Sequence, residues 1–354
     1  MQLSRAELTD RRSTGQRPSN RTSDAVESRV LEVRRFLRDD SALGDHGAWA
    51  IREHMESEGD VEVPSLRTIG RILARRGALD ARTRVRRPSP QPGWYVPEVA
   101  GGKSELDSFD VIEALVIRGG ADVEILTAIS LHGGLCQVWP VEVVLAKTVI
   151  SALAEHWKTA GLPGYAQFDN DGCFYGSRRT PDAVGRVSRM CMALGVVPVF
   201  APPAEHGPQS QIEAFNGLWQ RRVWQRFEHA DLKGLRARSR AWVLAHRGRH
   251  AERIERAPLR REFPAAFELD LQKHPEGRMV LLRRTDERGR VTLMKRHFLA
   301  DRRWQGRLVR CEVDLGAGRI DFYALRRRDP GSQPKLGEAA YELPRKRFWE
   351  GPQD

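Results

Sequence analysis

Three strand-like runs in close succession, separated by glycine turns, place the tightest constraint on what this chain can fold into. The runs read SELDSFDVIEALVI, ADVEILTAIS and LCQVWPV, with RGG and LHGG between them, a pattern typical of β-hairpins. The later segments predict, in order, a helix at VEVVLAKTVISALAEHWKTAG, a strand at GYAQFD, a helix around PDAVGRVSRMCMALG, a strand at VVPVF and a long helix starting near Gln211. The expected order is β-β-β-α-β-α-β-α, which is a mixed α/β sheet with flanking helices.

That order is the order of a ribonuclease H-like domain, which we expect over residues 99–257. A chain of 354 residues has room for two or three domains. Residues 1–25 lack apolar periodicity and predict a disordered basic arm, and the Pro-rich stretch 81–98 predicts a linker. Residues 258–354 return to short strands with alternating apolar and basic residues, and they predict a small β-barrel that contacts DNA or another subunit.

Residues 26–80 predict a helical domain of the helix-turn-helix kind. Ser65 is a good N-cap and Gly77 a good stop for a helix whose apolar stripe includes Ile69 and Ile72. An arginine row on a second helix suits the major groove and its phosphate edges, although a solvated basic face would look the same. The predicted DNA-contacting residues here are Arg67, Arg71 and Arg75, followed in the linker by Arg84, Arg86 and Arg87.

The charge of the chain favours a polyanionic partner. The formal net charge is +12, with 40% hydrophobic and 30% charged residues, and the pI is near 10.0. The four cysteines stand at 136, 173, 191 and 311 without any CxxC spacing, which argues against a structural zinc site. No apolar run approaches the length of a membrane span, so we expect a soluble protein. The positive charge leads us to expect DNA as its partner.

Acidic residues recur at distinctive positions of the expected core. Asp107 lies within the first strand, Asp169 ends the fourth strand in QFDNDGCF, and Glu213 opens the last helix in QIEAFNGLW. Converging carboxylates repel one another unless a divalent cation joins them. Strand alternation places Asp107 and Asp110 on opposite faces, so the two compete for one place in the site. The DND segment taken alone could also be an ordinary turn.

These three motifs, ELDSFD, QFDNDGCF and PPAEHGPQSQIEAFNGLWQRRVW, resemble the catalytic core of DDE-type transposases and integrases of bacterial insertion elements. The resemblance spans roughly residues 100–230 and includes the Glu-x-x-Asn-Gly run of Glu213, Asn216 and Gly217. It implies that Asp107, Asp169 and Glu213 are both catalytic residues and metal ligands, for two Mg²⁺ or Mn²⁺ ions. The sequence departs from the family's Asp-Asn-Gly by inserting Asp171, which we interpret as the turn acid.

The resemblance also implies an activity and a setting. It implies metal-dependent cleavage at element ends followed by strand transfer, by a homo-multimer in the bacterial cytoplasm, associated with the nucleoid. Gln220, Arg221 and Arg222, on the helix that carries Glu213, are expected to hold DNA phosphates. His206 and Gln209 in the preceding loop are candidates for DNA contact, although a lone histidine in a loop more often faces solvent.

Two other functions stay open from the sequence. One is a structure-specific nuclease that uses the same carboxylates without joining strands. The other is a DNA-binding regulator whose core is catalytically inactive. A glycosidase is a distant alternative, because the net charge and an aromatic content of 7% do not suit a sugar cleft.

Overall fold

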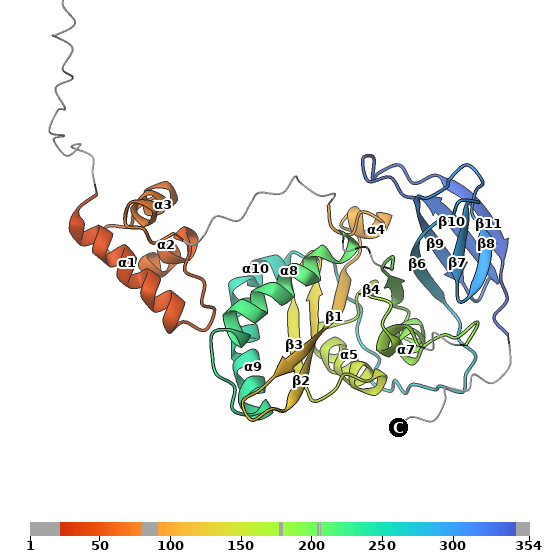
Figure 1. Cartoon of the computed structure of the whole chain (residues 1–354), viewed down its shortest axis with the longest axis horizontal. Helices are drawn as coiled ribbons and strands as arrows, with labels where there is room; N and C mark the ends of the chain where they lie inside the picture. The colour runs from red at the N-terminus through yellow and green to blue at the C-terminus, as the bar shows by residue number, and fades with distance from the viewer. Residues whose placement is uncertain (1–21, 80–90, 177–179, 204, 206, 345–354) are drawn as a thin grey trace, which may run out of the picture. The chain divides into compact units, whose positions relative to one another are not determined.

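The computed structural model describes residues 22–79, 91–176, 180–203, 205 and 207–344. The chain divides into two compact units, residues 1–85 and residues 86–354, which are considered separately below (Figure 1). Most of the predicted arm and the linker arginines Arg84, Arg86 and Arg87 lie outside the described residues, as does His206.

The described part of the N-terminal unit, residues 22–79, contains three helices, as its apolar periodicity predicts. Ser23 and Ser65 cap two of them, each accepting a hydrogen bond from a backbone N–H three residues on. The connection over residues 58–65 is longer than the short turn of the usual helix-turn-helix, so that motif stays a prediction. The helices are α1 (Asp24–Asp39), α2 (Ala48–Ser57) and α3 (Leu66–Arg75), and their buried core is Val30, Val33, Ile51, Met55, Ile69, Ile72 and Leu73.

The second unit has the predicted order of strands and helices in its first part. The elements are α4 (Pro97–Ala100), β1 (Leu106–Val116), β2 (Asp122–Ser130), β3 (Cys136–Val141), α5 (Ala146–Ala160), β4 (Tyr165–Phe168), α6 (Gly172–Tyr175), α7 (Arg186–Ala193), β5 (Val197–Phe200), η1 (Gly207–Gln209), α8 (Ser210–Trp219), η2 (Gln220–Trp224), α9 (Leu232–Arg249) and α10 (Ala251–Glu255). The strands β1, β2 and β3 are antiparallel neighbours, whereas β1, β4 and β5 run parallel. This mixed sheet is consistent with a ribonuclease H-like core.

The two faces of β1 are covered by different helices, and this decides which side chains can meet. Phe109 packs on the rings of Trp157 from α5 and Phe168 from β4, within the larger hydrophobic core. The opposite face turns toward α8, whose Asn216 hydrogen-bonds Asp110. Alternation along β1 therefore gives Asp107 and Asp110 different surroundings.

Part of the predicted linker belongs to this unit rather than to a spacer. Trp94, Tyr95, Val96 and Val99 are buried against the sheet together with Leu106. The prediction of a linker over 81–98 is therefore wrong for residues 94–98, because their large apolar side chains gain more by covering the sheet than by staying in water.

The C-terminal strands extend the same sheet. They are β6 (Arg278–Arg284), β7 (Arg290–Leu293), β8 (Arg296–Leu299), β9 (Leu308–Asp314), β10 (Arg319–Ala324) and β11 (Lys335–Ala340). Strand β6 pairs in parallel with β5, which gives one nine-stranded sheet in the order β11-β10-β9-β6-β5-β4-β1-β2-β3, with β7–β8 as a separate hairpin (Figure 1).

The expected separate barrel over 258–354 is thus corrected by a continuous sheet with a shared hydrophobic core. Buried side chains such as Phe322 and Val313 belong to the same core as Phe168 and Phe200. An exposed β5 edge would leave unpaired backbone groups, and β6 covers that edge. No helix in the described part of the chain has both the length and the apolar character needed to cross a membrane.

Candidate active site

Asp107, the favoured first acid, forms a buried ion pair with Arg260. Its carboxylate is fully buried and accepts hydrogen bonds from Arg260 at 2.5 and 3.0 Å and from the Trp157 indole N–H at 3.0 Å. His156 lies 3.7 Å away on α5. Burial alone would raise the pKa of Asp107, but the Arg260 guanidinium outweighs it and holds that pKa below its usual range. The carboxylate therefore serves the packing between β1, α5 and the segment after α10.

The register between β1 and β4 explains why Asp107 cannot meet Asp169. Asp107 lies beside Ala166, and Ser108 lies beside Gln167. Continuing this parallel register brings Asp110 level with Asp169, just beyond the end of β4. Asp107 lies three residues earlier, about 10 Å back along the strand. The structure thus brings Asp110, and not Asp107, to the end of β4, and the preference for Asp107 is corrected.

Asp110 is electrostatically coupled to both of the other predicted acids. Its pKa is raised to about 6, first because the side chain is largely buried and then because Asp169 and Glu213 add negative charge nearby. Burial is the largest cause of the shift, and the contributions of Asp169 and Glu213 show that both carboxylates lie near Asp110. Asp110, Asp169 and Glu213 therefore form one acidic cluster, with one member each from β1, the β4–α6 turn and α8.

Asn216 ties the helix of Glu213 to the strand of Asp110. Its amide Nδ2 donates to Asp110 Oδ2 at 2.8 Å, while its Oδ1 accepts from the Thr127 hydroxyl at 2.7 Å. The Thr127 donor fixes which way the amide points, so that Nδ2 must face the carboxylate. Residues three apart share a helix face, and the Glu-x-x-Asn spacing was the sequence signal for this positioning role.

The DND turn is built as an Asx turn that leads into a short helix. Asp169 Oδ1 accepts from the backbone N–H of Asp171 at 2.8 Å, and Asp171 Oδ1 accepts from the N–H of Cys173 at 2.9 Å. Asp171 is the N-cap of α6, in agreement with its interpretation as the turn acid. Gly172 lies in ordinary helical conformation with open space where a Cβ would be, so the turn does not require glycine at this position.

Asn170 anchors the same turn to the neighbouring strands. Its Nδ2 donates to the Ala201 carbonyl at 2.6 Å just after β5, and its Oδ1 accepts from Arg283 of β6 at 2.9 Å. Arg283 also donates to the Leu282 and Ala201 carbonyls at 2.8 and 3.3 Å. Arg283 was not predicted from the sequence, because its position next to β5 follows only from the extended sheet.

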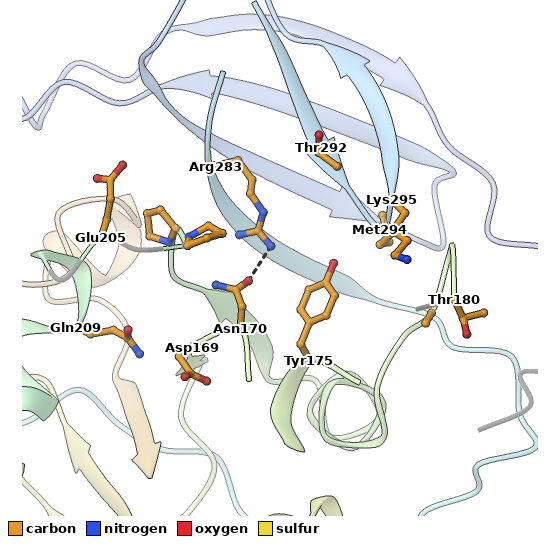
Figure 2. Close-up of a pocket in the computed structure, with 13 residues that line it drawn as sticks. Asp169, Asn170, Tyr175, Thr180, Glu205, Gln209, Arg283, Thr292, Met294 and Lys295 are labelled. Carbon is orange, nitrogen blue, oxygen red and sulfur yellow. Dashed lines mark hydrogen bonds between the residues drawn. The ribbon is translucent and has the colours of Figure 1, made fainter. Parts of the chain in front are cut away.

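A cavity of about 530 Å³ opens beside Asp169, between the DND turn and the β7–β8 hairpin (Figure 2). Its lining includes Asp169, Asn170, Tyr175, Gln209, Arg283, Thr292, Met294 and Lys295. The loop after β5 closes one side with Pro202 and Pro203. Gln209, considered for DNA contact from the sequence, therefore lies at the wall of this cavity.

Three carboxylates are a donor set that suits Mg²⁺ or Mn²⁺, which prefer oxygen ligands. The repulsion that raises the pKa of Asp110 is the repulsion that a divalent cation would relieve. Within the described residues, no group of three His, Cys, Asp or Glu side chains is gathered closely enough to hold a metal ion as it stands. The chemistry of the donors fits a cation, and the described side-chain positions do not form a coordination shell.

The predicted DNA-binding residues fall into three groups. Arg67 and Arg71 are exposed on α3, whereas Arg75 pairs with the fully buried Glu27 of α1. Arg75 thus serves the three-helix packing, together with Arg76, which donates to Glu27 at 2.7 Å. The third group lies on the π-helical segment η2 directly after α8, where Arg221 is exposed and Gln220 and Arg222 are half-buried.

No protein-family model matches the chain, and no curated protein matches it. Among solved structures, the catalytic core domain of BIV integrase is similar with a TM-score of 0.29 and 15% sequence identity, over 40% of this chain and 81% of that domain.

Proposed function

We propose that this protein is a metal-dependent polynucleotidyl transferase, a transposase of the DDE type, whose acids are Asp110, Asp169 and Glu213. The observation that carries the proposal is that acids from three separate elements lie together: Asp169 and Glu213 both raise the pKa of Asp110, in addition to the larger effect of burial. A buried carboxylate with a raised pKa beside other carboxylates is typical of functional sites. Asp107 is assigned a structural role instead.

Two Mg²⁺ or Mn²⁺ ions bound by these acids would activate the attacking oxygen and stabilise the leaving oxygen of an in-line phosphodiester displacement. The chain's own residues prepare that site. Asn216 holds the Asp110 carboxylate in one orientation, and the Asx turn fixes Asp169 at the end of β4. Asn170 and Arg283 lock that turn to β5 and β6. The acids are therefore positioned by side chains from α8, the β4–α6 turn and β6.

The surrounding charge supports DNA as the substrate. The formal net charge of +12 favours association with a polyanion. Arg67 and Arg71 on the exposed face of α3, and Arg221 after α8, are proposed to contact phosphates. Cleavage at two paired element ends by a homo-multimer is part of the proposal, as the motif resemblance implies.

The deciding experiment is a nicking assay with supercoiled plasmid that carries the DNA flanking the reading frame. We expect Mg²⁺- or Mn²⁺-dependent nicking by the wild-type chain and losses of at least about 100-fold in Asp110→Asn, Asp169→Asn and Glu213→Gln, typical for removing an electrostatic catalytic group. Exposed Asp122→Asn at the start of β2 is the matched carboxylate control. Full activity in any one of the three variants would remove that residue from the site.

A nuclease on the same fold is separated from a transposase by its products. DNA with a pre-cut 3′ end should be joined covalently to a second duplex by a transposase. A structure-specific nuclease would shorten the same DNA without producing a joined product.

A further inference from the structure

The cavity beside Asp169 has one wall that the acidic cluster does not explain. That wall is the tip of the β7–β8 hairpin, where Met294 and Lys295 form a two-residue connection between Leu293 and Arg296. Both line the same cavity as Asp169 and Asn170 of the DND turn (Figure 2). The C-terminal strands thus complete a compartment whose other side carries a proposed catalytic carboxylate.

The hairpin tip is held in an unfavourable backbone conformation. Met294 and Lys295 have φ values of 46° and 62°, as a type I′ turn requires, yet neither is the Asn or Gly that such turns favour. Asp182, with φ of 59°, lies against this tip. The described residues contain four non-glycine residues with positive φ, and three of them meet here. Strain of about 1–3 kcal/mol at each such residue persists where surrounding contacts enforce it, often at ligand sites.

Asp182 is the contact that enforces it. Its backbone N–H donates to the Met294 carbonyl at 3.2 Å, and its carboxylate pairs with Arg296 at 2.6 Å. The Tyr341 hydroxyl donates to the other Asp182 oxygen at 3.0 Å. Asp182, which lies between α6 and α7, holds the hairpin tip, and Tyr341 after β11 holds Asp182 in turn. Lys295 therefore has a fixed position in the cavity wall.

The lining carries two cations, Arg283 and Lys295, beside two carboxylates and an apolar surface. The carboxylates are Asp169 of the acidic cluster and Glu205, which pairs with Arg284 at 2.6 Å. Arg283 is only 8% exposed, and its hydrogen-bond partners in the described chain are carbonyl and amide oxygens and Tyr175, with no carboxylate among them. A buried guanidinium without a counter-charge favours an anion in the adjacent space. Met294, Tyr175 and two prolines supply the apolar surface, and Gln209 supplies an amide.

We propose that this cavity binds one nucleotide of the DNA strand, with its phosphate attracted by Arg283 and Lys295. The inference rests on the proposed function and adds a substrate-binding role for the C-terminal strands. A volume of about 530 Å³ is within the usual range for small-ligand sites. A nucleotide needs what the lining offers, namely apolar contact for the base, an amide for its edge and cations for its phosphate.

The test measures binding of thymidine monophosphate to the full chain by ligand-observed NMR, without metal and without cleavage. Thymidine and inorganic phosphate serve as partial probes. We expect the nucleotide to bind more tightly than either part alone, and Lys295→Asn to weaken binding about 3- to 10-fold, as for loss of one charge-assisted contact. Asparagine accepts positive φ, so the variant should keep or gain thermal stability.

Lys273→Gln, at an exposed site away from the cavity lining, is the matched control and should bind like wild type. Equal binding by Lys295→Asn and wild type, or competition by phosphate as strong as that by the nucleotide, would overturn the inference. The two proposals can fail independently. Nicking that survives replacement of the three acids would contradict the proposed function, and nucleotide binding that depends on Lys295 could still be observed.

Discussion

The Asp107 carboxylate and the Arg260 guanidinium form a bidentate ion pair, with contacts of 2.5 and 3.0 Å, at the start of β1. Arg260 also donates to the Gly161 carbonyl at 3.2 Å, so the pair joins β1, the end of α5 and the segment after α10. Breaking such a pair destabilises the fold, because the partner that remains is a buried charge without a counter-charge.

Replacing Asp107 should therefore damage stability rather than the chemistry. We expect Asp107→Asn to lower the free energy of unfolding by about 3–5 kcal/mol, because Arg260 loses its counter-charge. Urea denaturation measures this. The folded fraction should still nick DNA in the presence of metal. The double variant Asp107→Asn/Arg260→Met should recover part of the loss, and a single variant as stable as wild type would contradict the structural role.

The pKa of Asp110 predicts a specific pH dependence of stability. Its folded-state pKa of about 6 lies above the ordinary value of 3.8, so the folded state holds the proton more tightly than the unfolded state. The stability that protonation provides is complete below about pH 4 and is lost as the pH rises through 6. Asp110→Asn avoids this loss, and we expect it to exceed wild type by about 1–2 kcal/mol at pH 8 without metal, with a smaller difference at pH 4.

Thermal unfolding of both proteins across pH 4 to 8 tests this linkage. Asp122→Asn, which changes an exposed carboxylate, should show no comparable trend. A stability difference between Asp110→Asn and wild type that stays constant with pH would contradict the coupling among the three acids.

Asn216 should tune the protonation of Asp110. Its amide hydrogen bond lowers the pKa of that carboxyl, against the larger opposing effect of burial. Asn216→Ala should raise the pKa further and move the acid limb of the Mg²⁺-dependent nicking profile to higher pH. Thr127→Val, which removes only the hydroxyl that orients the amide, should shift the limb in the same direction by less. An unchanged profile in Asn216→Ala would show that this contact does not position the acid.

The arginines of α3 should separate into binding and structural residues. Arg67→Gln and Arg71→Gln should each reduce the slope of log affinity for duplex DNA against log salt by about 0.9, if each contacts one phosphate. Arg75→Gln should instead destabilise the N-terminal unit, since it removes a partner of the buried Glu27. Fluorescence anisotropy at several salt concentrations and urea denaturation distinguish the two effects. If the Arg67 and Arg71 variants keep the wild-type slope, α3 does not contact DNA.

Much of the core was predictable from the sequence, because glycine turns and apolar runs report strand order directly. The positions of Asp169 and Glu213 followed from short motifs at the end of a strand and the start of a helix. The choice between Asp107 and Asp110 did not follow. Alternation correctly separates them onto opposite faces, but residues 106–109 are buried on both faces. Which face meets Glu213 depends on α8, a contact more than 100 residues away.

The C-terminal strands show a second limit of sequence reasoning. Alternating apolar and basic residues predict strands, and these formed. The pairing of β6 with β5 depends on an open sheet edge, which no local pattern records. For the same reason, Arg283 and the hairpin residue Lys295 could not be connected with Asp169 before the sheet order was known.

The most direct measurement is the location of Mn²⁺ by anomalous X-ray scattering from crystals of the chain soaked in that ion. We expect an anomalous peak coordinated by Asp110, Asp169 and Glu213, and no ion at Asp107, where Arg260 already pairs with both carboxylate oxygens. A peak bound by Asp107, or no peak among the three clustered acids at saturating Mn²⁺, would contradict this expectation.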